Sequence, residues 1–584
     1  MVRTLIPFTS CLLVMSLALV STSCAKDEGD SSSSGDAEST GGDGDGDGDG
    51  DGDGDGDGDG DGDGDGDGDT AFCDGLGLPV ATLAAEGGTG WGDVGGAFSV
   101  NTTFGPWDLE ENWSGCDSYF FIVDNGDSLS AQLKGTLGPE LFERSPRNVH
   151  YFFVTATGDA AAGADSWQQA TAGALLQVED VELQDYFLDR VHFVTDAPAD
   201  MAGSVGSFMS ANAGVAAFAL DRGQRWDNPG AYYDITNTFV TSSPIYGYVP
   251  RYYNFRHAQQ LELEAQTGVT EVAVIDQQEF TPDCLVGEPC FDTQNGPFSN
   301  SNNNRVWTAS FPPATEMANF DTLELVVSAT CGPDNYSDCG HWDYEAFIDL
   351  CDNDMCDNVL GQVARWITPY SRPGTRTWVL DASSYLGYLQ AGGDQFFRFS
   401  MVWNMNPSTW DVRFRLRDAG EATRPTETVL VHNANRGFND TYNDGFTPLT
   451  FTPPAGTTKV EIATIISGHG QATGNCAEWC NHQHEFTVNG TGTHMRQFSG
   501  EAGLTHGCAE MVDEGVVPGQ WGNWTPGRAG WCPGLPVQPW VMDITDDVQI
   551  GMENTLEYRG LYANQPPTGD RGRIRINTVL VYHQ

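Results

Sequence analysis

The strongest constraint on the fold is an alternation of apolar and polar residues in the C-terminal half of the chain. Apolar residues spaced two apart begin at Leu323, Val412 and Val460, and Gly, Pro and Asn cluster between such runs. Successive side chains of a strand point to opposite faces, so this pattern is typical of strands with one buried face. Helical periodicity is nearly absent. Residues 270–424 and 425–584 are therefore predicted to form two all-β antiparallel jelly-roll sandwiches packed side by side.

A different pattern occupies residues 71–265. Continuous apolar runs such as Tyr119–Val123 and Val149–Val154 alternate with segments of helical periodicity such as Ala160–Leu176. Strands that are apolar throughout are buried on both faces, which favours a parallel or mixed α/β sheet. The order of elements resembles thioredoxin-like redoxins, including the lead-in Gly105–Trp113 before the first long strand. The other segments of these two kinds are Val191–Val194, Val215–Leu220 and the helical Ala199–Met209.

The redox chemistry of that family needs a low-pKa Cys just after the first long strand. Asp124–Asp127 stand in this place, and Cys116 comes before the strand. We therefore expect this thioredoxin-like domain to be inactive in redox chemistry and to act as a scaffold or recognition module.

Residues 1–23 are predicted to be a signal peptide of the lipoprotein type. Arg3 precedes the apolar run Cys11–Val20, which is too short to span a membrane, and small residues lead to Cys24. The pattern resembles bacterial lipoprotein signals, in which Cys24 would be lipidated. Plain secretion is the alternative, because Ser21 stands where such signals usually carry Leu or Val. The protein is expected to be exported, as an outer-membrane lipoprotein or extracellular, and to meet a membrane only through a lipid anchor.

Residues 24–70 are predicted to be an acidic linker. From Asp43 to Asp69, Asp and Gly alternate without interruption. Gly is entropically costly to order and neighbouring carboxylates repel each other, so an extended tether is favoured. Calcium binding is the alternative, but the stretch lacks the bidentate Glu of calcium loops.

The net charge of −55 excludes one class of function. A field of this sign repels nucleic-acid phosphates, so we expect no nucleic-acid partner. Aromatic residues make up 11% of the chain, with 16 Trp, a profile that is common in proteins that bind sugars.

The 14 cysteines support export. Twelve remain if Cys11 leaves with the signal and Cys24 is acylated, and an even number in an exported chain indicates disulfides. Zinc is the alternative, but each pair lacks a second Cys-x-x-Cys or a correctly spaced His pair. The pairs close in sequence are Cys284/Cys290, Cys331/Cys339, Cys351/Cys356 and Cys476/Cys480; Cys508/Cys532 is wider, and Cys73 and Cys116 remain.

Four strings carry a more specific signal. They are Cys331–Asp343, Trp366–Tyr370, Asn475–Cys480 and Gly522–Gly534. In this order they resemble the bacterial peptide-N-glycosidase F family, amidases that remove N-linked glycans from glycoproteins. The resemblance covers about residues 270–584. It implies an exported amidase that hydrolyses the bond between N-acetylglucosamine and asparagine of an N-linked glycoprotein or glycopeptide, releases the glycan and leaves aspartate.

The resemblance also implies the site residues. Asp343 matches the family's primary catalytic Asp, and Glu478 matches its essential Glu. A carboxylate is needed to take the proton of the attacking water, and positioned general bases typically contribute ~10²–10⁴-fold. The tight Cys476–Cys480 loop would orient Glu478. The implied disulfides are Cys331–Cys339, Cys476–Cys480 and Cys508–Cys532.

Other residues are expected to contact the substrate. Arg528 would orient it or hold the site together. Trp342, Trp403 and Trp531 would offer flat faces to sugar rings, with core packing as the alternative for each.

This chain departs from the family pattern at a second acid. Met401 stands where the family has a Glu two residues before a Trp. Losing one carboxylate of a cluster changes the charge and the pKa coupling of the others. A glycan- or glycoprotein-binding lipoprotein without catalysis is therefore the second hypothesis.

No cofactor is expected, with a single metal ion as the alternative. His482 and His484 share a strand face, and His469 stands where the family has a Trp. With Glu478 nearby, these three histidines could hold a single metal ion. Copper-dependent peptide-hydroxylating monooxygenases have a similar double jelly roll, but they need three His in the first domain, where this chain has only His341. Hydrogen-bonded buried histidines are the alternative.

Overall fold

The computed structural model describes residues 68–85, 87–231, 246–280, 305–331, 342–400, 408–470 and 472–584. The predicted signal peptide, Cys24 and most of the linker lie outside the described residues, as do Cys284 and Cys290. Within the described part, none of the helices has the length and apolar character to cross a membrane.

The first described part is an α/β domain around a mixed five-stranded sheet with strand order β5-β4-β3-β7-β8. The central strand β3 (Ser118–Asp124) is parallel to β4 (Val149–Thr155) and antiparallel to β7 (Ala217–Leu220). Every residue of β4 is buried, as its continuous apolar run predicted. The remaining elements are α1 (Gly68–Gly75), β1 (Phe98–Thr102), β2 (Gly105–Asp108), α2 (Ser128–Thr136), α3 (Glu140–Glu143), α4 (Ala160–Leu175), α5 (Val181–Leu188), β5 (Val191–Phe193), β6 (Ala202–Gly203), α6 (Ser204–Ala211), β8 (Trp226–Asp227) and α7 (Tyr248–Ala265).

One predicted helix starts later than expected. Apolar periodicity predicted a helix over Ala199–Met209, but α6 begins at Ser204. Ala202 and Gly203 pair with β1 instead, and Gly203 has φ of 78°, a left-handed conformation that glycine adopts without strain. Tertiary pairing has therefore overridden the local helical pattern.

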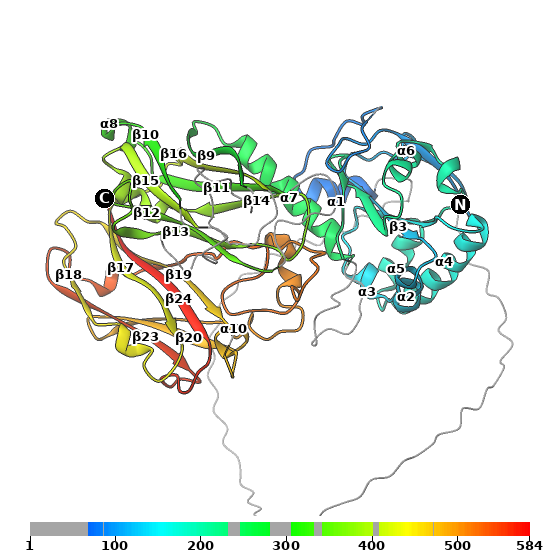
Figure 1. Ribbon diagram of the computed structural model, residues 1–584. Coiled ribbons are helices and arrows are strands. Elements are labelled where there is room, and N and C mark those ends of the chain that lie inside the picture. Colours follow the sequence, from blue (N-terminus) through cyan, green and yellow to red (C-terminus); the bar gives the residue numbers. More distant parts are fainter. Residues whose placement is uncertain are drawn as a thin grey trace, which may run out of the picture. The chain divides into compact units, whose positions relative to one another are not determined.

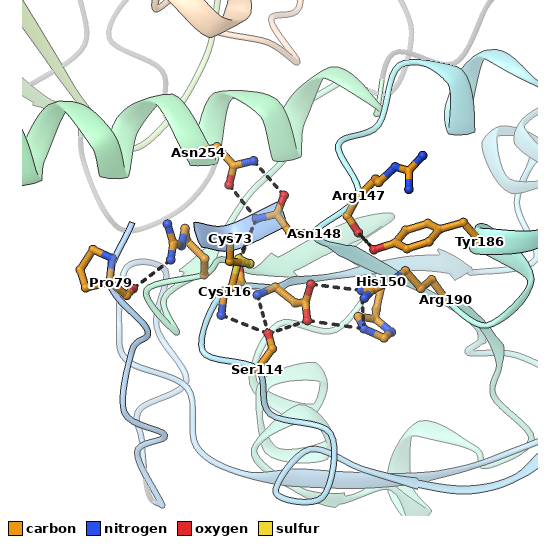
Figure 2. The surroundings of a disulfide bond; sticks show 12 residues. Cys73, Pro79, Ser114, Cys116, Arg147, Asn148, His150, Tyr186, Arg190 and Asn254 are labelled. Atoms are coloured by element: carbon orange, nitrogen blue, oxygen red, sulfur yellow. Dashed lines mark hydrogen bonds and ion pairs between the residues drawn. A yellow bond between two sulfur atoms is a disulfide. The ribbon is translucent and has the colours of Figure 1, made fainter. Parts of the chain in front are cut away.

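A disulfide fastens the N-terminal helix to the sheet (Figure 2). Cys73 of α1 is bonded to Cys116, just before β3, and both are buried. Next to it, Asn148 and Asn254 exchange two hydrogen bonds of 2.8 Å, which join the start of β4 to α7. This disulfide lies at the opposite end of β3 from Asp124, so it serves as a structural tie.

The second described part consists of two antiparallel β-sandwiches, coloured green and yellow to red in Figure 1. When the eight described strands of each sandwich are numbered in chain order, both have sheets in the order 1-8-3-6 and 2-7-4-5. This double Greek key is the jelly-roll arrangement. The strands are β9 (Thr270–Phe280), β10 (Arg305–Phe311), β11 (Thr322–Cys331), β12 (Glu345–Cys351), β13 (Val359–Ile367), β14 (Thr375–Asp381), β15 (Gly393–Ser400) and β16 (Ser408–Arg417), then β17 (Pro425–Gly437), β18 (Leu449–Phe451), β19 (Lys459–His469), β20 (His482–Val488), β21 (Gly492–Gln497), β22 (Trp540–Asp543), β23 (Asn554–Tyr562) and β24 (Arg573–His583). The short helices are α8 (Ala314–Met317), α9 (Leu386–Leu389) and α10 (Cys476–Trp479).

The predicted apolar faces form the sandwich cores. Leu323, Leu325 and Val327 of β11 are fully buried, and their neighbours are only partly buried. Trp366, Trp378 and Trp410 meet in the centre of the first sandwich, with ring centroids 6.1–6.4 Å apart. These large rings fill the space between its two sheets.

The two sandwiches are joined through the end of β13. Ile367 donates a hydrogen bond to Leu535 (3.0 Å) and accepts one from Gly534 (3.0 Å). Val537 donates to the Arg365 carbonyl at 2.8 Å. Residues 534–537 of the second sandwich therefore continue the pairing of a first-sandwich strand, and Ile367, Ile465, Trp531 and Val537 close the contact with apolar side chains.

We expect Trp366→Ala to lower the free energy of unfolding of the sandwich part by about 3–5 kcal/mol, because the ring is fully buried and its removal leaves a cavity. Urea denaturation followed by far-UV circular dichroism measures this. Met355→Ala, at an exposed turn, is the control and should change the value by less than about 0.5 kcal/mol. A similar small effect for Trp366→Ala would contradict the described core.

Candidate active site

Asp343 lies in a short segment that leads into β12. The strand itself begins at Glu345, two residues after Asp343. Thr368 fixes the segment: its hydroxyl accepts from the Tyr344 amide at 3.0 Å and donates to the Trp342 carbonyl at 3.2 Å. The Asp343 side chain is 16% exposed, so solvent and substrate can reach it.

Glu478 is held by the tight loop that the sequence predicted. The Cys476–Cys480 disulfide is present and encloses α10, a single helical turn. One Glu478 oxygen accepts a hydrogen bond of 2.7 Å from the Gly470 amide. Gly468 lies so close to this turn that a Cβ would be 1.6 Å from the Ala477 carbonyl oxygen, which explains the glycine. The Glu478 side chain is 13% exposed.

The two carboxylates come from different sandwiches and meet on one arginine. Arg528 Nη2 lies 3.4 Å from Asp343 Oδ2, and Arg528 Nε lies 3.3 Å from Glu478 Oε1. The guanidinium is fully buried and lies between the rings of Trp479 and Trp531, with its carbon 4.5 and 4.7 Å from their centroids. Arg528 therefore fixes the relative position of the two acids.

Tyr370 is a fourth member of this group. Its hydroxyl donates to the Asp343 carboxylate and lies 3.3 Å from Arg528 Nη2. Burial and the Asp343 charge raise the pKa of Tyr370, so the phenol stays protonated. Tyr370 lies in the string Trp366–Tyr370, which by itself predicted no role for it; its place in that string, two residues after Thr368, was the available signal.

Burial controls the titration of Asp343. It raises the pKa of this carboxyl group to about 6, against the opposing effects of Arg528 and the Tyr370 hydrogen bond, and with a contribution from the negative charge of Glu478. A carboxylate with this pKa can accept and return a proton near neutral pH.

The predicted aromatic residues divide into two kinds. Trp342 is 59% exposed beside Asp343. Trp531 is buried, packs against His469 at 5.3 Å and donates from Nε1 to the Gly468 carbonyl at 2.6 Å, so it supports the site. Trp403 and Met401 lie outside the described residues.

A second charged cluster, which the sequence did not predict, lies where the sandwiches meet. Glu345 contacts His469 at 3.0 Å, Arg575 at 3.3 Å and Arg365 at 3.9 Å. Burial raises its pKa, but His469 and Arg575 outweigh this effect and hold the pKa well below the usual range. His469 is therefore occupied by Glu345 and by Ser467, whose hydroxyl is 2.8 Å away.

His482 and His484 share a face, as expected, but they bond to each other. Burial lowers the pKa of His482 to about 4 and that of His484 well below its usual range, so both rings are neutral. His482 Nε2 donates to the Ala477 carbonyl, His484 Nε2 donates to His482 Nδ1, and His484 Nδ1 accepts from the Tyr558 hydroxyl.

All four ring nitrogens of this pair are thus engaged, and His469 points to Glu345 instead. Within the part of the chain that the structure describes, no three His, Cys, Asp or Glu side chains gather in a way that could hold a metal ion. The arrangement corrects the metal hypothesis in favour of hydrogen-bonded histidines.

The other predicted disulfides have different outcomes. Cys508–Cys532 is present, and Cys351–Cys356 and Cys73–Cys116 are also bonded. Cys331 is disulfide-bonded, while its predicted partner Cys339 lies outside the described residues.

Comparison with known proteins agrees with the motifs. Residues 437–582 match the family model for the C-terminal domain of peptide-N-glycosidase F. The chain is 25% identical over 278 residues to peptide-N(4)-(N-acetyl-beta-D-glucosaminyl)asparagine amidase F of Elizabethkingia miricola, which covers 45% of this chain and 74% of that protein. Solved structures with similarity include PNGase F of Flavobacterium meningosepticum (20% identity, 54% of this chain and 96% of that one, TM-score 0.40) and PNGF-II (11% identity, 56% and 66%, TM-score 0.39).

Fold and site together define a double β-sandwich protein with a carboxylate–arginine site where the sandwiches meet. Residues 437–582 match the C-terminal domain of peptide-N-glycosidase F, and the amidase of Elizabethkingia miricola is a relative of this chain.

The raised pKa of Asp343 has a consequence for stability. A group whose pKa is about 6 when folded and about 3.9 when unfolded favours folding in its protonated form, so its contribution is present below about pH 4 and is lost as pH rises through 6. Asp343→Asn removes this dependence. Between pH 4 and pH 7.5, we expect the unfolding free energy of Asp343→Asn to rise relative to the wild type by about 2–3 kcal/mol.

Urea titrations at the two pH values measure this difference. Asp546 is an exposed residue in the turn after β22, and Asp546→Asn is the matched control. It should change the free energy of unfolding by the same amount at both pH values. A difference between Asp343→Asn and wild type that does not depend on pH would show that Asp343 ionises normally.

Proposed function

We propose that this protein is an exported amidase that hydrolyses the bond between N-acetylglucosamine and the asparagine side chain of N-linked glycoproteins, releases the glycan and leaves aspartate. The observation that carries the proposal is the meeting of Asp343 and Glu478, from different sandwiches, on the buried Arg528. The match of residues 437–582 to the peptide-N-glycosidase F C-terminal domain and the similarity to the amidase relative support the same reaction.

In the proposed mechanism, Asp343 acts as the general base. It takes a proton from a water molecule whose oxygen attacks the side-chain carbonyl carbon of the substrate asparagine. The bond from that carbon to nitrogen then breaks, and the nitrogen leaves with the sugar after receiving a proton from Asp343. The first products are an aspartate and a glycosylamine, which later loses ammonia. Arg528 holds the base in position, and burial gives it a suitable pKa.

Glu478 has a different proposed role. One oxygen accepts a hydrogen bond from the Gly470 amide and the other contacts Arg528, so this carboxylate is fixed beside Asp343. A fixed carboxylate that is partly exposed can accept hydrogen bonds from sugar hydroxyl or acetamido groups. We assign it to sugar binding and orientation.

A non-catalytic glycan-binding protein is the second candidate, and the residue Met401 favours it, because the family has a carboxylate at this position. Binding without release of glycan would be the result if the remaining carboxylates cannot complete the reaction.

For the α/β domain we propose a thioredoxin-like fold without redox activity. The order β4-β3-β7-β8, with β3 and β4 parallel and β7 antiparallel to both neighbours, supports this fold. Asp124 and Asn125 follow β3 where a redox Cys would stand.

We also propose that Cys24 is the site of a lipid anchor. The four described disulfides support an oxidising compartment.

The amidase proposal is tested with a denatured N-glycoprotein. We expect wild-type protein to release glycan and to convert the glycosylated asparagine to aspartate, as peptide mass spectrometry detects. Asp343→Asn should lower kcat by about 10²–10⁴-fold because the base is lost. Glu478→Gln should lower kcat/KM by about 10- to 100-fold because a charged hydrogen-bond acceptor is lost.

Asp546→Asn serves as the control and should keep full activity. Retention of the glycoprotein without release of glycan by the wild type would instead support the binding protein. Full activity of Asp343→Asn would overturn the assignment of the base.

The pH dependence of the reaction gives a further test. Because Asp343 must be ionised to accept a proton, kcat/KM should fall as pH drops below about 6. Tyr370→Phe removes a hydrogen bond that lowers the pKa of Asp343, so the midpoint of its pH profile should move upward. An unchanged midpoint in Tyr370→Phe would exclude Asp343 as the group that controls the acidic limb.

A further inference from the structure

Two tryptophans are exposed in a protein that buries most of its large rings. Among the described tryptophans, Trp342 and Trp521 are the most exposed, with 59% and 50% of their surface accessible to solvent. Trp524, three residues further along the same loop, is fully buried. An exposed indole adds little to folding stability, and exposed aromatic faces often mark binding sites. Trp342 was predicted to contact the substrate, whereas Trp521 had no predicted role.

The loop that carries Trp521 is fixed against Tyr370. The Trp521 amide donates to the Tyr370 carbonyl at 3.3 Å, and the Tyr370 amide donates to the Gln520 side chain at 2.7 Å. Gly522 packs on the Tyr370 ring so closely that a Cβ would lie 2.2 Å from the ring carbon. Trp521 is therefore exposed on a backbone that is held in place, which is the condition for a preorganised binding surface.

Trp342 approaches the same tyrosine from another element. Its ring meets the Tyr370 ring edge-on, with centroids 6.4 Å apart. Tyr370 also contacts Asp343 and Arg528 through its hydroxyl. Both exposed indoles are thus attached to the residue that borders the two catalytic candidates, one through its ring and the other through its backbone.

We propose that Trp521 is a specificity residue that binds a sugar ring of the glycan other than the ring attached to asparagine. The proposal rests on the amidase function proposed above. Trp342 directly precedes Asp343 and serves the sugar next to the reacting amide. Trp521 is joined to the site only through the Tyr370 backbone and serves a sugar further along the glycan. A flat indole face suits the C–H face of a neutral pyranose, and such a ligand avoids the repulsion that this acidic protein exerts on anions.

The test compares glycopeptides of one peptide sequence that carry one sugar, two sugars or a longer glycan. We expect Trp521→Ala to match wild type on the one-sugar substrate and to lose about tenfold in kcat/KM once the glycan is long enough to reach it. Trp521→Phe keeps an aromatic face and should recover most of the loss. Trp342→Ala should lose activity at every glycan length.

Phe104→Ala, which removes an exposed ring from the β1–β2 turn of the α/β domain, is the matched control and should behave as wild type. Equal loss by Trp521→Ala at all glycan lengths, or loss at none, would overturn the proposal. In a second series with one glycan on peptides of increasing length, a loss that grows with peptide length would assign Trp521 to the protein part of the substrate and also overturn the proposal.

A binding measurement distinguishes failure of the amidase function from failure of the proposal for Trp521. If wild type releases no glycan, a free oligosaccharide of N-acetylglucosamine is titrated by calorimetry into wild type, Trp521→Ala and Phe104→Ala. Weaker binding by Trp521→Ala alone, increasing with oligosaccharide length, supports the sugar platform without catalysis. Equal binding by all three proteins overturns it.

Discussion

The site depends on one buried guanidinium. Arg528 is fully enclosed, and a buried positive charge without partners costs several kcal/mol. Its carboxylate partners, Asp343 and Glu478, belong to different sandwiches. Within its own sandwich Arg528 pairs with Glu478 and donates to the Asn523 and Pro526 carbonyls, and it gains its second carboxylate, Asp343, only when the two sandwiches are docked. The two carboxylates are close only in the same state. Correct docking of the domains and assembly of the site are thus one event.

The surroundings of Arg528 show how this arrangement is made rigid. Trp479 and Trp531 cover the guanidinium on both sides, and disulfides anchor the segments that carry them. The pairing of β13 with residues 534–537 places backbone hydrogen bonds beside the site. Glu345, His469 and Arg575 add a second ionic contact across the same boundary. Geometry at the carboxylates is thus maintained by covalent, backbone and ionic constraints together.

Local pattern was sufficient to predict much of the fold. The two-residue spacing of Leu323, Leu325 and Val327 predicted which face of β11 is buried, because strand alternation depends only on neighbouring residues. The Cys476–Cys480 bond could likewise be inferred from a short string. The start of α6 was misplaced because Ala202 and Gly203 pair with a strand distant in sequence. Contacts of this kind leave no local periodicity.

The site was predictable only in part for the same reason. Asp343, Glu478 and Arg528 were found because they lie in recognisable strings, but no string shows that Tyr370 bonds to Asp343 or that Glu345 pairs with His469. The histidine pair was misjudged as a possible ligand set because the donors and acceptors that occupy the rings, Ala477 and Tyr558, become visible only in three dimensions.

The strand order of the second sandwich has a consequence for biosynthesis. β24 lies inside its sheet, between β17 and β19, although it is the last strand of that sandwich to be made. A nascent chain therefore exposes the facing edges of β17 and β19 until β24 has been synthesised. Throughout that interval the growing polypeptide has open strand edges of the kind that pair with other chains, so it is prone to aggregate before the sandwich closes.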